Sequence, residues 1–163
     1  MIVVADTSIL INLCCVGRGH LLSRLFREVV IPPAVAEEFA RLASRVARFA
    51  GLSLPEGIRQ QAAVTLPALL ASTSGLDPGE RAALALAVEI HADAVLLDER
   101  RGREAASRLG LRSIGLLGVL LQAKAAGLIP SLQPILDDLQ RDAGFWITEA
   151  LREQVLKLAG ERT

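Results

Sequence analysis

Short apolar runs alternate with helix-forming segments over the first 115 residues of this sequence, and this alternation constrains the fold most. Four runs are predicted to be strands: MIVVA, VVIPP, ADAVLLD and LRSIG. Longer segments with helical spacing of apolar residues separate them. Strands that alternate with helices indicate βαβ units, which build a parallel sheet covered on both faces. The pattern therefore predicts an α/β fold with a central parallel sheet.

Helix start signals lie between these strands. A helix is predicted from Pro33, because proline suits the first turn and no breaker follows before Gly51. Another helix begins at Asp77 and Pro78, an N-cap followed by a first-turn proline. Residues 52–76 are the least decided stretch, and we expect a short extended piece, one or two short helices and a polar loop there.

Length and composition favour one domain. A chain of 163 residues that is 52% apolar can bury a sizeable core. We expect a single domain over residues 1–163, with an α/β core at 1–115 and additional helices at 116–163. The apolar runs are far shorter than the roughly 18 residues of a membrane-spanning helix, and we see no leader peptide. With two adjacent cysteines as well, we expect a cytoplasmic protein without a membrane partner.

The formal net charge is zero, which gives no hint of a polyanionic partner. The distribution of charge is less even, since arginines gather at residues 41–48 and 100–112. Arg100, Arg101 and Arg103 could hold a phosphate backbone, because a guanidinium group suits bidentate phosphate contact. A solvated helix face is the more common explanation for such a run.

Two acidic residues stand where predicted strands end. Asp6 follows the first strand, and Asp98 follows ADAVLL. The carboxyl ends of parallel strands lie along one edge of the sheet, where ligands bind, so both carboxylates can face one cleft. Aspartate is also a favoured helix N-cap, and capping alone would explain either residue.

Two glutamates extend this set. Glu38 shares the apolar face of its helix with Val35 and Leu42, and a carboxylate there is costly unless it is paired or binds a cation. Its alternative role is simply to reach the rim of the core. Glu80 lies three residues after Asp77, which is the position of the second residue of a capping box, so capping would explain it.

These four acids, Asp6, Glu38, Glu80 and Asp98, would converge on one pocket in the predicted sheet. Like charges about 4 Å apart repel by about 4 kcal/mol at an effective dielectric constant of 20. Such a cluster needs raised pKa values or a bound cation. Ligands that are all oxygen favour a hard divalent ion, Mg²⁺ or Mn²⁺. Because such an ion activates water and bridges phosphodiester oxygens, the acids predict phosphoryl-transfer chemistry.

Four sequence blocks, in this order, resemble the successive motifs of PIN domains. They are VVADTSILINL, IPPAVAEEF, LDPGERAALALA and the stretch that begins ADAVLLDERRGREAASRLG. The likeness is greatest to an uncharacterised bacterial and archaeal subgroup similar to VapC-type toxins, and it extends over nearly the whole chain. The resemblance implies a three-layer α/β/α sandwich. It also implies an Mg²⁺- or Mn²⁺-dependent endoribonuclease, with RNA as substrate, an antitoxin protein as a possible partner, and a homodimer.

Carried over by matching motifs, the resemblance makes the four acids both the metal ligands and the catalytic residues. Ser8 would help to orient a water molecule bound to the metal. Glu80 departs from the aspartate that many VapC-type sequences have, and the ERRGRE text after the fourth strand departs from the usual one. Phe145 and Trp146 are candidates for a dimer or antitoxin contact, or else belong to the core.

Other functions fit less well or remain as rivals. The main alternative is a non-catalytic PIN-fold interaction module whose acids are helix caps, and the zero net charge slightly favours it. Phosphatases of the haloacid-dehalogenase type need a second aspartate where this chain has Ser8. Receiver domains need a phospho-acceptor aspartate after a later strand and a lysine downstream of it, and this chain has only Lys124 and Lys157.

Overall fold

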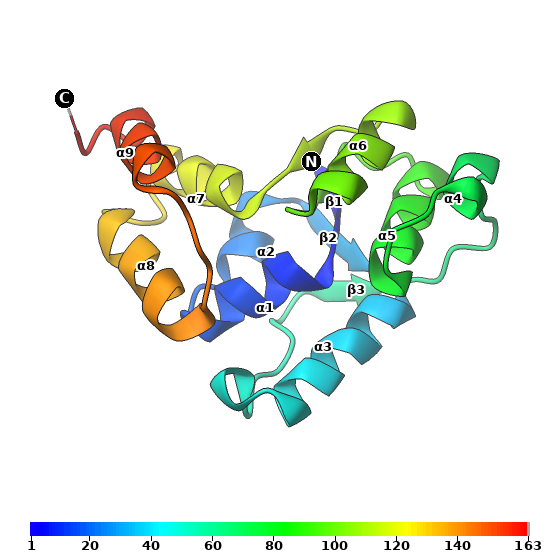
Figure 1. The fold of residues 1–163 in the computed structure, drawn as a ribbon, viewed down its shortest axis with the longest axis horizontal. Coiled ribbons are helices and arrows are strands. Elements are labelled where there is room, and N and C mark those ends of the chain that lie inside the picture. The colour runs from blue at the N-terminus through cyan, green and yellow to red at the C-terminus, as the bar shows by residue number, and fades with distance from the viewer. Residues whose placement is uncertain (163) are drawn as a thin grey trace.

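A five-stranded, all-parallel sheet forms the centre of the protein in the computed structural model, which describes residues 1–162 (Figure 1). The strands are β1 (Ile2–Ala5), β2 (Glu28–Ile31), β3 (Ile58–Gln60), β4 (Ala94–Leu96) and β5 (Ser113–Ile114). Their order across the sheet is β3-β2-β1-β4-β5, and every neighbouring pair is parallel. The strand order changes direction between β1 and β4, where sheets of this kind open a crevice at their carboxyl ends.

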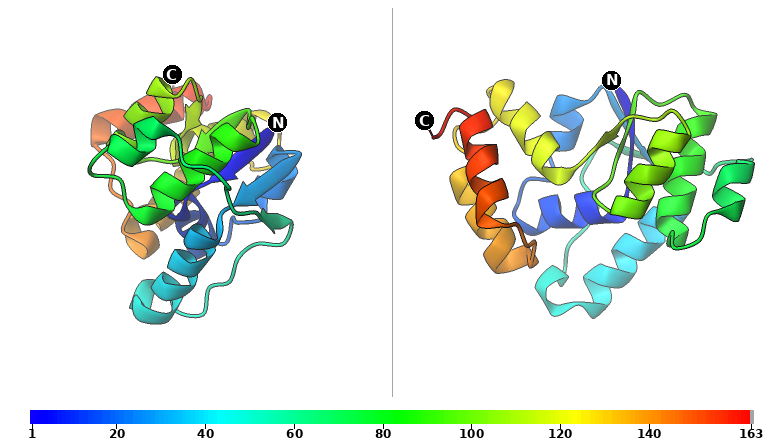
Figure 2. Two further views of the ribbon diagram at one scale, coloured as in Figure 1. Left: turned by 90° about the vertical axis from the view of Figure 1, so that its right-hand side faces the viewer. Right: turned by 45° about the horizontal axis from the view of Figure 1, so that its top comes forward.

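Helices cover both faces of the sheet, which confirms the predicted α/β/α arrangement (Figure 2). Helix α5 packs on β1 and β4, and α6 packs on β5, while α2 packs on β2 and contacts α7. Every helix among residues 1–162 falls short of the length and apolar character of a membrane-spanning segment. The helices are α1 (Thr7–Cys15), α2 (Leu21–Leu25), α3 (Pro33–Arg45), α4 (Ala68–Ser72), α5 (Pro78–Glu89), α6 (Arg100–Arg108), α7 (Leu116–Ala125), α8 (Gln133–Asp138) and α9 (Glu149–Leu158), with a 3-10 turn η1 (Ala47–Phe49) and a π-helical turn η2 (Leu139–Ala143).

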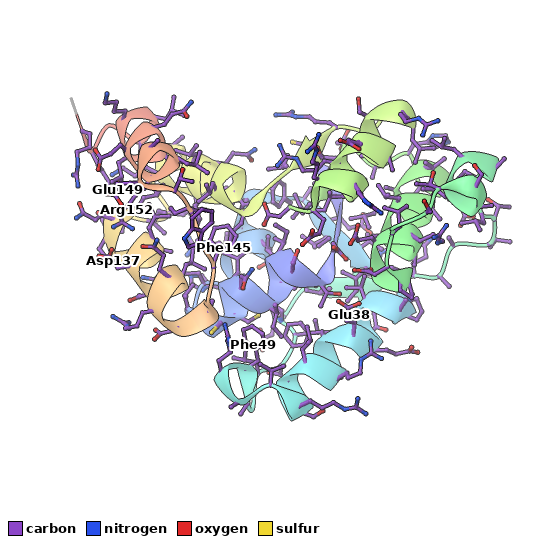
Figure 3. The ribbon with its side chains drawn as sticks, in the orientation of Figure 1. Glu38, Phe49, Asp137, Phe145, Glu149 and Arg152 are labelled. Atoms are coloured by element: carbon purple, nitrogen blue, oxygen red, sulfur yellow. The ribbon has the colours of Figure 1, made fainter. Side chains whose placement is uncertain are left out.

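The carboxyl-terminal helices pack on the outside of this sandwich. Turn η2 contacts α1, and α9 contacts α7. Arg152, which is only 9% exposed, joins α9 to the preceding helical segment (Figure 3). Its guanidinium group pairs with the carboxylate of Asp137 and donates a 3.0 Å hydrogen bond to Gln140. This buried arginine is therefore satisfied inside the molecule.

The predicted helix from Pro33 is shorter than expected. It ends at Arg45 because Val46 adopts an extended backbone, and the chain then forms turn η1. This change of direction brings Phe49 into the core, where it is 9% exposed. Packing of one aromatic side chain thus stops a helix whose sequence contains no breaker. Residues 52–76 contain β3 and α4, as the expected extended piece and short helix.

The core is mainly aliphatic, and the few polar side chains buried in it are not spread evenly. Strand residues of β1, β2 and β4 are almost completely buried, as expected for parallel strands covered on both faces. The buried polar or charged residues among 1–162 are Asp6, Thr7, Glu80 and Arg152. Three of these four gather where β1 and β4 end, which is the edge of the sheet with the strand-order switch.

Candidate active site

Asp6 is held at the switch between β1 and β4. Its backbone N–H donates a 2.9 Å hydrogen bond to the carbonyl of Leu96 in β4, and the residue is 3% exposed. Asp6 occupies the N-cap position of α1, but its side chain makes no capping hydrogen bond. Its Oδ1 atom is buried and has no hydrogen-bond partner within residues 1–162. Helix capping therefore does not explain Asp6.

Glu80 lies in the first turn of α5 and is 5% exposed. Its N–H donates a 2.7 Å hydrogen bond to Oδ1 of Asp77, which confirms Asp77 as the N-cap. The expectation that Glu80 completes a capping box with Asp77 is wrong, because the Glu80 side chain turns toward α6 instead. A Cβ atom added to Gly102 of α6 would lie 2.9 Å from Oε2 of Glu80. This oxygen is buried without a hydrogen-bond partner among residues 1–162.

Three carboxylates converge at the amino-terminal end of α5. A Cβ atom added to Gly79 would lie 3.0 Å from Oε2 of Glu38, 3.3 Å from Oδ1 of Asp77 and 3.6 Å from Oδ1 of Asp6. Glu38 is half-buried on α3 and lies at the end of that helix that meets α5 (Figure 3). Glycine at position 79 leaves the space into which these side chains point. From the sequence we expected Asp77 only as a cap, although its place one turn before Glu80 was the available signal.

Asp98 lies at the same edge of the sheet, on the side of α6 and α7. Its Oδ1 accepts a 3.0 Å hydrogen bond from the N–H of Leu116, the first residue of α7. Its Oδ2 is buried and unpartnered within residues 1–162. Asp98 does not cap α6, the helix that follows it, whose N-cap is Glu99, so its alternative explanation is wrong in that form; it bonds instead to the first N–H of α7. The next residue, Glu99, was not predicted as a site residue, yet its charge acts on both Asp6 and Asp98.

The crowding of acids raises their pKa values. Burial, followed by the charges of Asp77, Glu38 and Glu99, raises the pKa of Asp6 from 3.8 to about 7, and the neighbouring backbone N–H of Thr7 lowers it by less. Burial and then the neighbouring Asp77 raise the pKa of Glu80 from 4.5 to about 8. Burial is also the main cause that raises the pKa values of Glu38 and Asp98. The site therefore holds protons at neutral pH unless a cation replaces them.

Five buried oxygen atoms at this edge lack hydrogen-bond partners within residues 1–162. They are Oδ1 of Asp6, Oγ1 of Thr7, Oγ of Ser8, Oε2 of Glu80 and Oδ2 of Asp98. Buried polar atoms are normally hydrogen-bonded, so such a group of acceptors indicates water or an ion. Oxygen atoms alone, most of them from carboxylates, are the donor set that Mg²⁺ and Mn²⁺ prefer. The residues present thus fit a hard divalent cation.

The spacing of the acids limits how they would hold an ion. Among residues 1–162, no three His, Cys, Asp or Glu side chains are grouped closely enough to hold one metal ion by themselves. Mg²⁺ commonly keeps several of its water molecules and binds through one or two carboxylates. In this arrangement one or two of the acids would contact the ion directly, and the others would act through water.

The arginines after Asp98 differ in their surroundings. Arg100 is highly exposed and pairs with Glu104 at 3.0 Å, as expected for a solvated helix face. Arg101 lies over Gly75, where an added Cβ would collide with its guanidinium group. Arg103 lies near Asp98 and lowers the pKa of that carboxyl group, although burial raises it more. Among these three arginines, only Arg103 affects the pKa of a predicted site residue.

Comparison with known proteins agrees with this architecture. A family model described as DUF3368: PIN domain matches residues 2–161. Among solved structures, the chain is similar to a PilT N-terminus domain protein, SSO1118, from the hyperthermophilic archaeon Sulfolobus solfataricus P2. The TM-score is 0.54 at 21% sequence identity, and the match covers 74% of this chain and 91% of that chain. At this identity the likeness concerns the fold. A search of curated proteins finds no match.

Proposed function

Because the chain belongs to the PIN domain family, a superfamily of nucleases, we propose that it is an endoribonuclease that depends on Mg²⁺ or Mn²⁺. The main support is the set of buried, unpartnered oxygens where β1 and β4 end. Leaving several carboxylate oxygens buried without partners is costly, and a divalent cation would remove that cost. Helix capping accounts for Asp77 and in part for Asp98, but leaves Asp6, Glu38 and Glu80 unexplained.

The proposed roles follow from the position of each side chain. Asp6 and Asp98, just after the two strands that flank the switch point, would hold the ion, and Glu38 would act through water. A divalent ion supplies a Lewis acid that offsets phosphodiester charge and activates water for attack. Glu80, whose raised pKa keeps it protonated at neutral pH in the absence of a cation, would accept the proton from an attacking water at Oε2 once a bound ion has displaced its own proton. The buried hydroxyl of Ser8 would orient that water.

RNA as the substrate is supported by the resemblance of the motifs to VapC-type toxins. The same resemblance supports an antitoxin protein and a homodimer as partners, and we propose both on that ground. These partners are separable from the chemistry, because every proposed catalytic side chain belongs to a single chain. Activity can therefore be tested on the purified protein.

The decisive experiment measures cleavage of labelled single-stranded RNA, and of DNA with the same sequence, with Mg²⁺, Mn²⁺ or a chelator. We expect RNA cleavage that needs the metal and that falls at least about 100-fold in Asp6→Asn and Asp98→Asn. Both substitutions preserve side-chain shape, so the fold should persist. Glu38→Gln should also lose activity, whereas its exposed neighbour Glu37→Gln provides a matched control with the wild-type rate.

The outcomes separate the enzyme from the interaction module. Cleavage that is unchanged in both Asp6→Asn and Asp98→Asn would refute the assignment of the site. Calorimetric titration with Mn²⁺ adds a readout without substrate, because a module whose acids are only caps has no specific divalent site. Loss of the titration signal in Asp6→Asn but not in Glu37→Gln would support the proposed centre.

A further inference from the structure

A groove of about 600 Å³ has Asp98 in its wall. It runs past the start of α7 to the segment that precedes α9. Side chains of α6, β5, α7 and α9 contribute to its walls, together with residues 145–147. We call this feature the Trp146 groove, and its principal lining residues besides Asp98 are Arg103, Arg112, Leu117, Phe145, Trp146 and Leu151.

Trp146 is the most unusual residue of this groove, because its side chain is 78% exposed. Phe145, next to it, is half-buried and packs against the core, between α1 and the carboxyl-terminal helices (Figure 3). The paired aromatic residues therefore divide their roles, since one anchors the segment and the other presents a ring to solvent. An exposed, flat aromatic surface suits the stacking of a planar ligand.

The charged residues of the groove are Asp98, Arg103 and Arg112. Both arginines are exposed, and neither forms a salt bridge within residues 1–162. Two unpaired guanidinium groups beside an exposed tryptophan combine phosphate contacts with a stacking surface. That combination is how proteins bind single-stranded nucleic acids, in which the bases are free to stack.

We propose that the Trp146 groove binds a single-stranded segment of the substrate, with one base stacked on Trp146 and its phosphates held by Arg103 and Arg112. The inference rests on the proposed nuclease function and extends it, because it assigns residues that select an unpaired strand. Asp98 is part of the wall of the groove, so a strand bound there lies beside one of the predicted site residues. The positive charge of both arginines favours nucleic acid over a protein partner as the occupant.

The chain offers a direct probe of this site, since Trp146 is its single tryptophan and it contains no tyrosine. A single-stranded RNA hexamer is titrated into the full chain with a chelator present, so that no metal-dependent cleavage occurs. We expect saturable quenching of the Trp146 fluorescence, because a stacked base alters the environment of the indole. A duplex of the same sequence should quench much less. Binding of the hexamer, seen by anisotropy of a label, without any change in Trp146 fluorescence would overturn the proposal.

Variants test the stacking and the phosphate binding separately. Trp146→Ala should weaken binding of the labelled hexamer between about 5-fold and about 150-fold, and Trp146→Phe should restore most of the affinity. Arg112→Gln should reduce the slope of log Kd against log salt by about 0.7 for each phosphate that the variant no longer neutralises. Leu158→Ala removes another exposed apolar side chain, 68% exposed on α9, and should bind like the wild type.

Failure of this inference and failure of the nuclease function give different results. If the wild type cleaves RNA and Trp146→Ala cleaves it with the same kcat/KM, the groove is not a substrate site while the function stands. If RNA quenches Trp146 but no metal supports cleavage, the groove stands and the nuclease function fails. If Trp146→Ala leaves RNA binding intact but changes the mass measured by light scattering, the surface serves a second copy of the chain, which also overturns the proposal.

Discussion

Asp6 is a carboxyl group held where water scarcely reaches it and where several neighbouring charges are also negative. Burial is the largest cause of its raised pKa, and the charges of Asp77, Glu38 and Glu99 add to it. A residue in this position stabilises the folded protein only if something neutralises it. Either a proton or a cation does so, and the two compete for the same oxygen atoms.

This competition predicts how stability depends on pH. The pKa of Asp6 is about 7 in the folded protein against an ordinary value of 3.8, so the folded state binds the proton more tightly. The stabilising contribution is complete below about pH 4 and is lost as the pH rises through 7. In chelator, the free energy of unfolding should fall over this range, by at most about 1.4 kcal/mol per pH unit from this group. Urea unfolding at pH 5 and pH 8 measures the fall.

Two comparisons test whether Asp6 is the group that causes this pH dependence of the free energy of unfolding. Asp6→Asn should have a smaller fall in the free energy of unfolding between pH 5 and pH 8, whereas Glu37→Gln should have the wild-type fall. Saturating Mn²⁺ should reduce the fall in the wild type, because the ion replaces the lost proton. An identical pH dependence in Asp6→Asn and in the wild type would show that other groups titrate in this range.

The amino-terminal end of α5 combines two tasks in one side chain. Asp77 caps the helix through the N–H of Glu80, and its charge raises the pKa of both Asp6 and Glu80. Asparagine caps a helix about as well as aspartate does, but it carries no charge. Exchanging one residue for the other therefore separates the structural task from the electrostatic one.

We predict that Asp77→Asn keeps nearly the wild-type stability in chelator, while Asp77→Ala loses about 1 kcal/mol. Both variants should bind Mn²⁺ more weakly, because each removes one negative charge from the acidic cluster. Thermal unfolding and calorimetric titration measure the two effects on the same samples. Full Mn²⁺ affinity in Asp77→Asn would restrict Asp77 to capping.

Helix α6 approaches the acidic cluster closely at Gly102. A Cβ atom there would lie 2.9 Å from Oε2 of Glu80 and 3.1 Å from Cδ1 of Leu97, so Gly102→Ala displaces the carboxylate. We expect Mn²⁺ affinity to fall about 10-fold to 100-fold, as when side chains that support metal ligands are changed. Gly118→Ala is the matched control in α7, since its Cβ would meet only a methyl group of Ile114. Equal Mn²⁺ affinities in both variants would show that the position of the Glu80 carboxylate does not affect metal binding.

The strand runs and helix starts were predictable because they depend on local chemistry. The β-branched residues of β1 and β2, and proline in the first turns of α3 and α5, act within a few residues of their own positions. The end of α3 was not predictable, because it depends on where Phe49 finds space in the core. The end of α3 therefore depends on packing against residues that are distant in the sequence.

The candidate site depends on the arrangement of the whole chain. Asp6 and Asp98 share an edge because β4 lies beside β1, which no local pattern specifies. The four predicted acids lie at this edge, yet Asp77 and Glu99 were missed because each has a simpler local role. The Trp146 groove was not predicted from the sequence either, since its tryptophan lies more than 30 residues after its two arginines.

The last segment of the chain is fastened to the carboxyl-terminal helices by Glu161. Its carboxylate accepts hydrogen bonds of 2.7 Å from the N–H of Leu132, 2.7 Å from the hydroxyl of Ser131 and 3.2 Å from the N–H of Gln133, and it pairs with Lys124 at 3.3 Å. Burial raises the pKa of Glu161, but these donors outweigh burial and lower the pKa to about 2. One carboxylate thus joins the end of the chain to α7 and to the start of α8.

We predict that Glu161→Gln lowers the free energy of unfolding at pH 7 by about 2 kcal/mol, because hydrogen bonds to a charged group are lost. The contribution of Glu161 is complete above pH 4.5 and disappears as the pH falls through about 2, so the difference from the wild type should shrink at pH 3. Glu153→Gln, which removes a more exposed 3.5 Å pair with Arg162, should change stability by less than about 0.5 kcal/mol.

Calorimetry should give one transition in each protein if residues 1–163 form one domain, with a midpoint about 4–8 °C lower in Glu161→Gln. A second, earlier transition in Glu161→Gln would mean that the carboxyl-terminal helices unfold separately from the sheet.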